Sequence, residues 1–196
     1  MQAEVVAAFS ETVRTPQQGL ARVIGWNFPH SIIWMAAFLV VVISAILNTV
    51  LTLLIPDILS GPQMIPSSPF LQAIVYFFAL VLSVLGTHYI GRLFGGTGDL
   101  AKSLTGVVWL QGVLLVFQVG QIVLLVAASG LGALYSIVLF VFTIWLYLNF
   151  VAAIHGFKSL ALVFMGFIAS SIGVGIGLAL IISTFAILIG LETPNV

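Results

Sequence analysis

Residues 32–55 read IIWMAAFLVVVISAILNTVLTLLI, a run of 24 residues without a charge. A helix rises about 1.5 Å per residue, so roughly 20 residues cross a hydrocarbon core about 30 Å thick. Fifteen of the 24 residues are Leu, Ile, Val or Phe, and each favours insertion at mid-membrane by about 0.3 to 0.6 kcal/mol. The amide of Asn48 does not offset that gain. The stretch is therefore predicted to be a transmembrane helix.

Four further apolar stretches follow, at residues 70–90, 104–128, 131–154 and 160–190. Each is long enough to span a membrane, and each is continuously apolar rather than alternating, which is typical of helices and not of a membrane β-barrel. The predicted fold is all-α: a polytopic membrane protein with a five-helix transmembrane domain at residues 31–190. A short interfacial segment at residues 1–30 precedes this domain, and a tail at residues 191–196 follows it.

The composition supports the same conclusion. Only 5% of the residues are charged and 62% are hydrophobic, whereas about 25% of a soluble domain is charged. The net charge is zero, and no basic stripe of the kind that binds nucleic acid is present. The lipid bilayer is the expected partner, and no cofactor or metal is expected.

The connections between the stretches differ in kind. Pro56, Pro62, Pro66 and Pro69 interrupt the chain after the first stretch, and proline cannot continue a helix. Ser129 and Gly130 leave room only for a tight turn, so the third and fourth helices are predicted to form an antiparallel hairpin.

The basic residues predict an orientation. With the N-terminus in the cytoplasm, all five cations fall on the cytoplasmic side: Arg14, Arg22, Arg92, Lys102 and Lys158. Asp57 and Glu192 fall on the opposite side. Positive residues concentrate on the cytoplasmic side of membrane proteins, so the N-terminus is predicted to be cytoplasmic and the C-terminus periplasmic.

The first thirty residues have an amphipathic pattern. Val5, Phe9 and Val13 recur at helical spacing beside Val6. A helix this short is marginal in water, so it is expected to lie on the membrane or against the bundle. A second short helical turn is expected around Leu20.

Polar residues gather at the predicted cytoplasmic ends of the helices. They form a candidate docking cluster for a partner or a lipid headgroup, and its members are His88, Arg92, Asp99, Lys102, His155 and Lys158. Ordinary interfacial anchoring is the alternative. The loop between the second and third stretches is rich in glycine but lacks the G-K-[ST] ending of a phosphate-binding loop.

Five amides lie inside the stretches and form a set of candidate intramembrane polar contacts: Gln111, Gln118, Gln121, Asn48 and Asn149. Polar groups in hydrocarbon are costly unless paired, so these amides should face the bundle interior. Interhelical hydrogen bonds and a transport pathway both explain them, and no acidic or basic residue lies deep in a stretch, as ion transport often requires.

The last stretch carries small residues at four-residue intervals on two lines: Ala169, Gly173 and Gly177, and Ser171, Gly175 and Ala179. Such spacing lets helix backbones approach closely. It predicts a helix-packing seam, either within the chain or between copies or with other membrane proteins.

No catalytic constellation is present. The sequence contains neither G-x-S-x-G nor H-E-x-x-H, and its acids lie at or beyond the ends of the stretches. The protein is therefore predicted not to be an enzyme.

Three short segments resemble the Ypt-interacting-protein (Yip) family. They are TPQQGLARVI at residues 15–24, the loop GRLFGGTGDL at residues 91–100, and AAIHGFKSLALV at residues 152–163. The resemblance implies a five-helix fold with a cytosolic N-terminus and the role of a non-enzymatic membrane adaptor. Eukaryotic members associate with Rab-type GTPases and have a long soluble N-terminal region. Only about thirty residues precede the first stretch here, which argues against GTPase binding.

The short N-terminal region favours a bacterial member in the cytoplasmic (inner) membrane, with the endoplasmic reticulum or Golgi membrane as the alternative. The predicted function is a membrane scaffold or accessory protein that acts through helix packing and a cytoplasmic polar face. The alternative is a small transporter or channel component that uses the glutamines of the third stretch.

Overall fold

The computed structural model describes residues 2–55 and 68–188, and beyond Gly173 the only side chain it describes is that of Ile176. Every regular element in these ranges is an α-helix. The chain divides into two compact units, Met1–Lys158 and Ser159–Val196. The predicted tail at residues 191–196, and with it Glu192, lies outside the described residues, as does Asp57.

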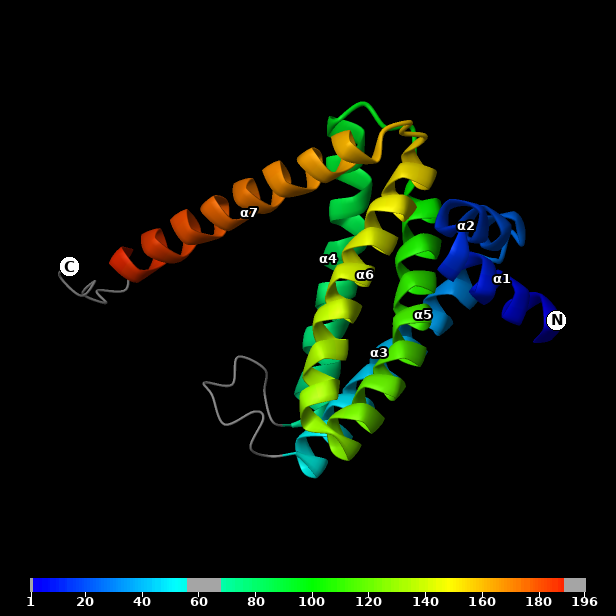
Figure 1. Ribbon diagram of the computed structural model, residues 1–196. Helices are drawn as coiled ribbons and strands as arrows, with labels where there is room; N and C mark the ends of the chain where they lie inside the picture. The colour runs from blue at the N-terminus through cyan, green and yellow to red at the C-terminus, as the bar shows by residue number, and fades with distance from the viewer. Residues whose placement is uncertain (1, 56–67, 189–196) are drawn as a thin grey trace. The chain divides into compact units, whose positions relative to one another are not determined.

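The first unit contains four helices that are long and apolar enough to cross a membrane: α3 (His30–Leu54), α4 (Pro69–Leu93), α5 (Leu100–Ala127) and α6 (Ser129–His155). Four of the five predicted spans are thus confirmed as long apolar helices. Helix α5 begins four residues earlier than predicted because Asp99 caps it. A single residue, Ala128, separates α5 from α6, so the predicted antiparallel hairpin is also confirmed (Figure 1).

Helix α5 is the centre of this bundle, since it contacts α3, α4 and α6. One core cluster joins α3, α4 and α5 and includes Val40, Leu80 and Val107. The second joins α5 and α6 to the N-terminal helices and includes Phe150. Large apolar side chains such as Leu39, Phe78 and Val138 point outward and are exposed. An apolar exterior of this extent suits lipid and not water.

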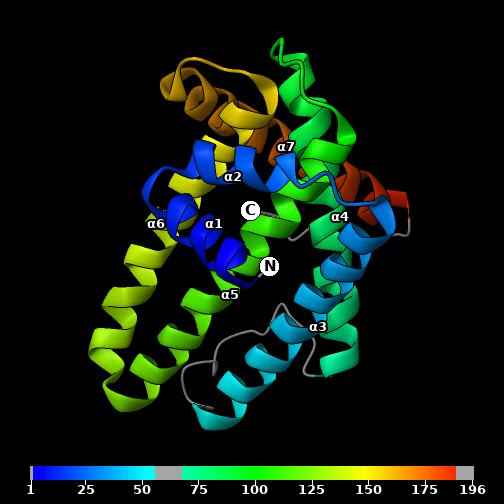
Figure 2. The ribbon, with the colours of Figure 1, turned by 90° about the vertical axis from the view of Figure 1, so that its right-hand side faces the viewer.

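Two short helices precede the bundle, α1 (Gln2–Arg14) and α2 (Pro16–Gly25). They form a hairpin that lies across α5 and α6 (Figure 2). Gly19 allows α2 to approach the backbone of Thr12 closely, because any Cβ there would overlap Thr12. The side chain of Leu20 is fully buried in the second core cluster. Of the expected apolar face, Val5 is exposed and Phe9 is half-buried, so the hairpin is held to the bundle mainly by α2.

The second unit contains α7 (Leu160–Leu188). Over the continuous part in which side chains are described, Leu160–Gly173, this helix is apolar but shorter than the four long apolar helices of the first unit. The predicted fifth span at residues 160–190 extends beyond that segment and stays a prediction. Three residues of the predicted helix-packing seam are exposed: Ala169, Ser171 and Gly173. The exposure of the other three is not described: Gly175, Gly177 and Ala179.

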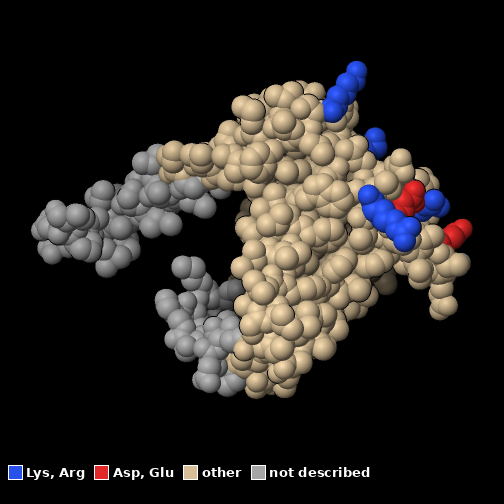
Figure 3. All heavy atoms as spheres, in the orientation of Figure 1, with Lys and Arg blue, Asp and Glu red and all other residues tan. Residues whose placement is uncertain are grey.

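The charged residues of the bundle gather at one end. Arg92 lies at the end of α4, Lys102 at the start of α5 and Lys158 after α6, and these three termini adjoin one another. Figure 3 shows charged atoms near this end and on the N-terminal helices, while the rest of the visible face is uncharged. We call this the cationic end of the bundle.

Candidate functional site

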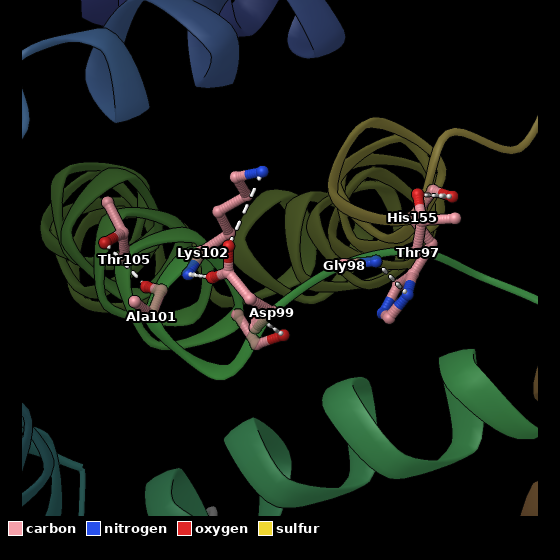
Figure 4. Close-up of polar contacts among 8 residues, drawn as sticks. Thr97, Gly98, Asp99, Ala101, Lys102, Thr105 and His155 are labelled. Carbon is pink, nitrogen blue, oxygen red and sulfur yellow. Dashed lines mark hydrogen bonds and ion pairs between the residues drawn. The ribbon is translucent and has the colours of Figure 1, made fainter.

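His155, the last residue of α6, is the centre of the cationic end. Its side chain is only 2% exposed, and both ring nitrogens have partners. Figure 4 shows the contact between Gly98 and the ring. The backbone N–H of Gly98 donates to Nδ1 at 3.2 Å, so Nδ1 carries no proton. Nε2 therefore carries the proton and donates to the carbonyl oxygen of Thr87, which lies 2.9 Å away. The ring is neutral and fully hydrogen-bonded.

Three glycines enclose this ring. A Cβ atom built on Gly91, Gly96 or Gly98 would overlap the imidazole of His155, and at Gly98 also Ile154. Only glycine lets the α4–α5 loop and the last turn of α4 approach the ring so closely. The clustered glycines of the loop thus have a packing role. We call His155 and these three glycines the histidine collar.

The backbone of the loop is fixed to the end of α6 as well. The N–H of Thr97 donates to the carbonyl oxygen of His155 at 3.2 Å, and the Thr97 hydroxyl donates to the same oxygen at 3.4 Å. Gly156 then ends α6 in a left-handed conformation with φ +74°, which favours glycine. The loop after α4 and the end of α6 therefore form one hydrogen-bonded unit.

Asp99 begins α5 as its N-cap. Its Oδ1 accepts the backbone N–H of Lys102 at 2.7 Å, and the Lys102 ammonium lies 3.5 Å from Oδ2. The hydrogen bond from the Lys102 backbone lowers the pKa of the Asp99 carboxyl below its ordinary value, and the Lys102 charge lowers it further. A carboxylate at a helix N-terminus is also favoured by the helix dipole. Asp99 therefore has a structural role, as its position near the start of this helix indicated.

The remaining members of the predicted docking cluster divide by burial. Arg92 and Lys158 are exposed, and neither forms an ion pair with any residue in the described ranges. His88 is buried, its ring packs on Tyr89 with centroids 4.9 Å apart, and its Nδ1 has no hydrogen-bond partner among the described residues. The surface of the predicted cluster thus consists of its charged members, while both histidines lie inside.

Exposed apolar side chains surround these charges. Tyr89, Leu93 and Phe94, at the end of α4, are 64%, 82% and 51% exposed. An aromatic and apolar rim beside cations is typical of a protein surface at the boundary between lipid and water. Within residues 2–55 and 68–188, no group of three or more His, Cys, Asp or Glu side chains is placed to hold a metal ion.

Three of the five intramembrane amides are paired. Asn48 donates to the Gln72 side chain at 3.1 Å, and Gln121 donates to Ser136 at 2.7 Å. Asn149 donates to a carbonyl of its own helix and accepts from Gln17 at 3.1 Å. Interhelical hydrogen bonds therefore explain these three.

Gln111 and Gln118 differ from the other amides. Both line a cavity together with residues of α3 and α4, and neither amide has a hydrogen-bond partner within the described part of the chain. Of the predicted intramembrane polar contacts, three are therefore hydrogen-bonded pairs, and Gln111 and Gln118 are the two amides without a described partner.

Sequence reasoning missed the polar contacts of the N-terminal hairpin. The Trp109 indole donates to the Thr12 hydroxyl at 2.9 Å, and Gln17 reaches Asn149 from α2. The one sequence feature that pointed to a packed hairpin was the segment PQQGLARV, in which a glycine lies between polar and apolar residues. That pattern did not reveal which surface the hairpin covers.

Comparisons with known proteins give one match. A family model described as Yip1 domain matches residues 10–190, which include the end of α1, all of α2, the bundle and α7. No curated protein and no solved structure matches the chain. Because the match covers most of the chain, it does not depend on the glycine-rich loop or any other single motif.

Proposed function

The chain belongs to the Yip1 domain family, and from that premise we propose that it is a non-catalytic membrane scaffold or accessory protein. It associates with other membrane components through helix packing in the bilayer and through the cationic end of the bundle. The observation that supports the proposal is the division at this end: His155 and Asp99 stabilise the fold, while the exposed side chains of Arg92 and Lys158 remain available to a partner.

The chemistry of this surface indicates the kind of partner. Exposed cations beside exposed Tyr89, Leu93 and Phe94 suit an acidic segment of a membrane protein that lies near the lipid headgroups. Surface cations contribute mainly to the rate and orientation of association. The N-terminal hairpin carries two further arginines, Arg14 and Arg22, which are not part of the cationic end; Arg22 pairs with Glu11.

The proposal includes a topology. Positive residues concentrate on the cytoplasmic side, so the cationic end faces the cytoplasm of a bacterial cell and α7 is the fifth span, with its C-terminus in the periplasm. The chain contains no cysteine, so single cysteines report the topology directly. An impermeant maleimide added to intact cells should label Ser129→Cys, at the opposite end of the bundle, and not Arg92→Cys. Equal labelling of the two variants contradicts the proposed topology.

Crosslinking in native membranes tests the scaffold role. A photoreactive residue in place of exposed Phe94 should capture a defined protein or a second copy of the chain. The double variant Arg92→Glu/Lys158→Glu should lose this product, because it reverses the charge beside the crosslinker, and Arg14→Glu should keep it. A product that is spread over unrelated abundant proteins, or that survives the double charge reversal, rules out the proposed surface.

The cavity lined by Gln111 and Gln118 favours a second candidate, a small transporter that uses the polar residues of α5. The paired state of Gln121 limits that pathway to the first two glutamines. Gln111→Leu/Gln118→Leu should abolish a flux of small polar solutes in proteoliposomes while the protein stays assembled. If the wild-type protein shows no flux, the transport hypothesis fails.

A further inference from the structure

A cavity of about 230 Å³ lies among α3, α4 and α5. Its polar lining comes from Ser44 of α3, Tyr76 and Ser83 of α4, and Gln111 and Gln118 of α5. Ser44 and Ser83 lie near the middle of their helices. The cavity is therefore at the depth of the hydrocarbon core and not at the cationic end.

The polar groups of the lining are not equivalent. The hydroxyls of Ser44 and Ser83 donate to carbonyls of their own helices, at 2.7 and 2.8 Å. The amides of Gln111 and Gln118 and the hydroxyl of Tyr76 have no hydrogen-bond partner among the described residues. Three side chains around the cavity are thus free to bind something within it.

Helices α3 and α4 also contain two amides that are hydrogen-bonded to each other, and these provide a comparison. One helical turn beyond Ser44 and Tyr76 lie Asn48 and Gln72, and their side chains bond to each other at 3.1 Å. An amide transferred to hydrocarbon without a partner costs about 4 to 8 kcal/mol. Asn48 and Gln72 satisfy each other, whereas Gln111 and Gln118 face a cavity large enough to hold a partner that the described residues do not supply.

The lining also defines the chemistry of an occupant. At about 30 Å³ per molecule, 230 Å³ would hold roughly eight waters. A bound water needs two to four polar partners, yet aliphatic side chains such as Val40 and Leu80 form much of the wall. No charged residue lines the cavity, so a phosphate or ammonium group would be buried without a counter-charge.

We propose that this cavity is a binding site for an uncharged amphiphile with a hydroxyl or ester group, of the diacylglycerol or fatty-alcohol type. The carboxamides of Gln111 and Gln118 and the hydroxyl of Tyr76 bind the polar group, and the aliphatic wall takes the adjoining hydrocarbon. This site does not depend on the scaffold role proposed above, because it uses none of the residues of the cationic end.

The absence of cysteine provides a direct test in lipid nanodiscs. Ser44→Cys places a single thiol in the cavity with little change in shape, and its rate of modification by methyl methanethiosulfonate reports occupancy. At a dioctanoylglycerol concentration ten times the Kd, the rate should fall about tenfold. Ser83→Cys is the second reporter, from α4, and Ser10→Cys, exposed on α1, should be unaffected.

Matched variants assign the protection to the glutamines. Gln111→Leu/Gln118→Leu should remove the protection of both thiols, whereas Gln121→Leu, whose amide bonds to Ser136 outside the cavity, should retain it. Dioctanoyl phosphatidic acid and free glycerol should protect neither thiol at the same concentration, because one carries a charge and the other lacks the hydrocarbon part.

Three results overturn the proposal: dioctanoylglycerol protects neither thiol, phosphatidic acid or glycerol protects them equally well, or the protection survives in Gln111→Leu/Gln118→Leu. The first result would mean that the cavity does not bind an amphiphile of this class. None of these outcomes affects the crosslinking test of the cationic end.

Discussion

The cationic end of the bundle and its middle both contain polar side chains, yet the two regions use them differently. At the end, His155 has a partner for each ring nitrogen and Asp99 caps α5. In the middle, Gln111 and Gln118 face a cavity without a partner among the described residues. His155 and Asp99 therefore stabilise the fold at the end, whereas Gln111 and Gln118 in the middle have hydrogen-bonding groups that the described residues do not use. Substitutions at the two regions should differ in size and in sign.

The largest effect is expected from Gly91→Ala in the histidine collar. The new Cβ overlaps the His155 ring, and the ring cannot move without losing both of its hydrogen bonds. Overpacking of this kind costs about 3 kcal/mol, measured as the free energy of unfolding in an SDS titration of the detergent-solubilised protein. Gly86→Ala on the same helix is the matched control, because the nearest side-chain atom there lies 3.9 Å away.

A double substitution shows whether the cost comes from the ring itself. In the background His155→Ala, the methyl group of Gly91→Ala has space, so the two changes together should cost less than the sum of each alone. Strict additivity would mean that Gly91 is required for a reason other than contact with His155.

The second effect is expected from His155→Ala alone. It leaves the N–H of Gly98 without its acceptor and creates a void at the collar, at a cost of about 2 kcal/mol. Exposed His30, at the start of α3, is the control, and His30→Ala should change the free energy of unfolding by less than 0.5 kcal/mol or so. A neutral result for His155→Ala would show that the hydrogen bonds of the ring do not stabilise the loop.

The transmembrane helices can be predicted from the sequence more readily than the contacts of the histidine collar. A span depends on local composition, and continuous apolar runs such as residues 32–55 are sufficient to predict it. The bonds of His155 join residues 57 and 68 positions apart, and the bond between Gln17 and Asn149 joins residues 132 positions apart. The pattern of residues within a short segment does not reveal which distant residues will form such hydrogen bonds. The four glycines within residues 91–98 did not indicate that the loop packs against a histidine at the end of another helix.

The docking cluster shows the same limit. His88 and His155 share the depth of Arg92 and Lys158, so sequence alone grouped them together. Only packing separates the buried rings from the exposed cations. In the same way, the glutamines of α5 have similar sequence surroundings, and the position of Ser136 on α6 decides that Gln121 is paired.

The third effect is expected from Asp99→Ala, which removes the N-cap of α5 and should cost about 1 kcal/mol. Asp99→Asn keeps a capping oxygen, so at pH 7 it should lose only the smaller part of the stability that comes from the charge of the carboxylate. The folded state lowers the pKa of the Asp99 carboxyl. The stability it contributes is therefore complete above the ordinary pKa of an Asp side chain and is lost as the pH falls through the lower pKa of the folded state.

The difference between wild type and Asp99→Asn in an acid titration measures that contribution. The carboxyl is largely exposed, so solvent screening keeps the contribution small. The two proteins should have the same stability at the lowest pH and diverge as the pH rises. Parallel curves over the whole range would show that the charge of Asp99 is not used.

The smallest changes in the free energy of unfolding are expected for the glutamines of α5, where two similar substitutions should have effects of opposite sign. Gln121→Leu removes a 2.7 Å hydrogen bond to Ser136, and interhelical bonds in membranes contribute about 0.6 kcal/mol on average. Gln111→Leu removes an amide that has no partner to lose, so its free energy of unfolding should stay the same or rise by a few tenths of a kcal/mol, because a leucine suits the apolar wall better. Unfolding in lipid nanodiscs without added diacylglycerol measures both. If Gln111→Leu is the more damaging of the two, the amide is already engaged in the resting protein, and the middle of the bundle would then resemble its cationic end.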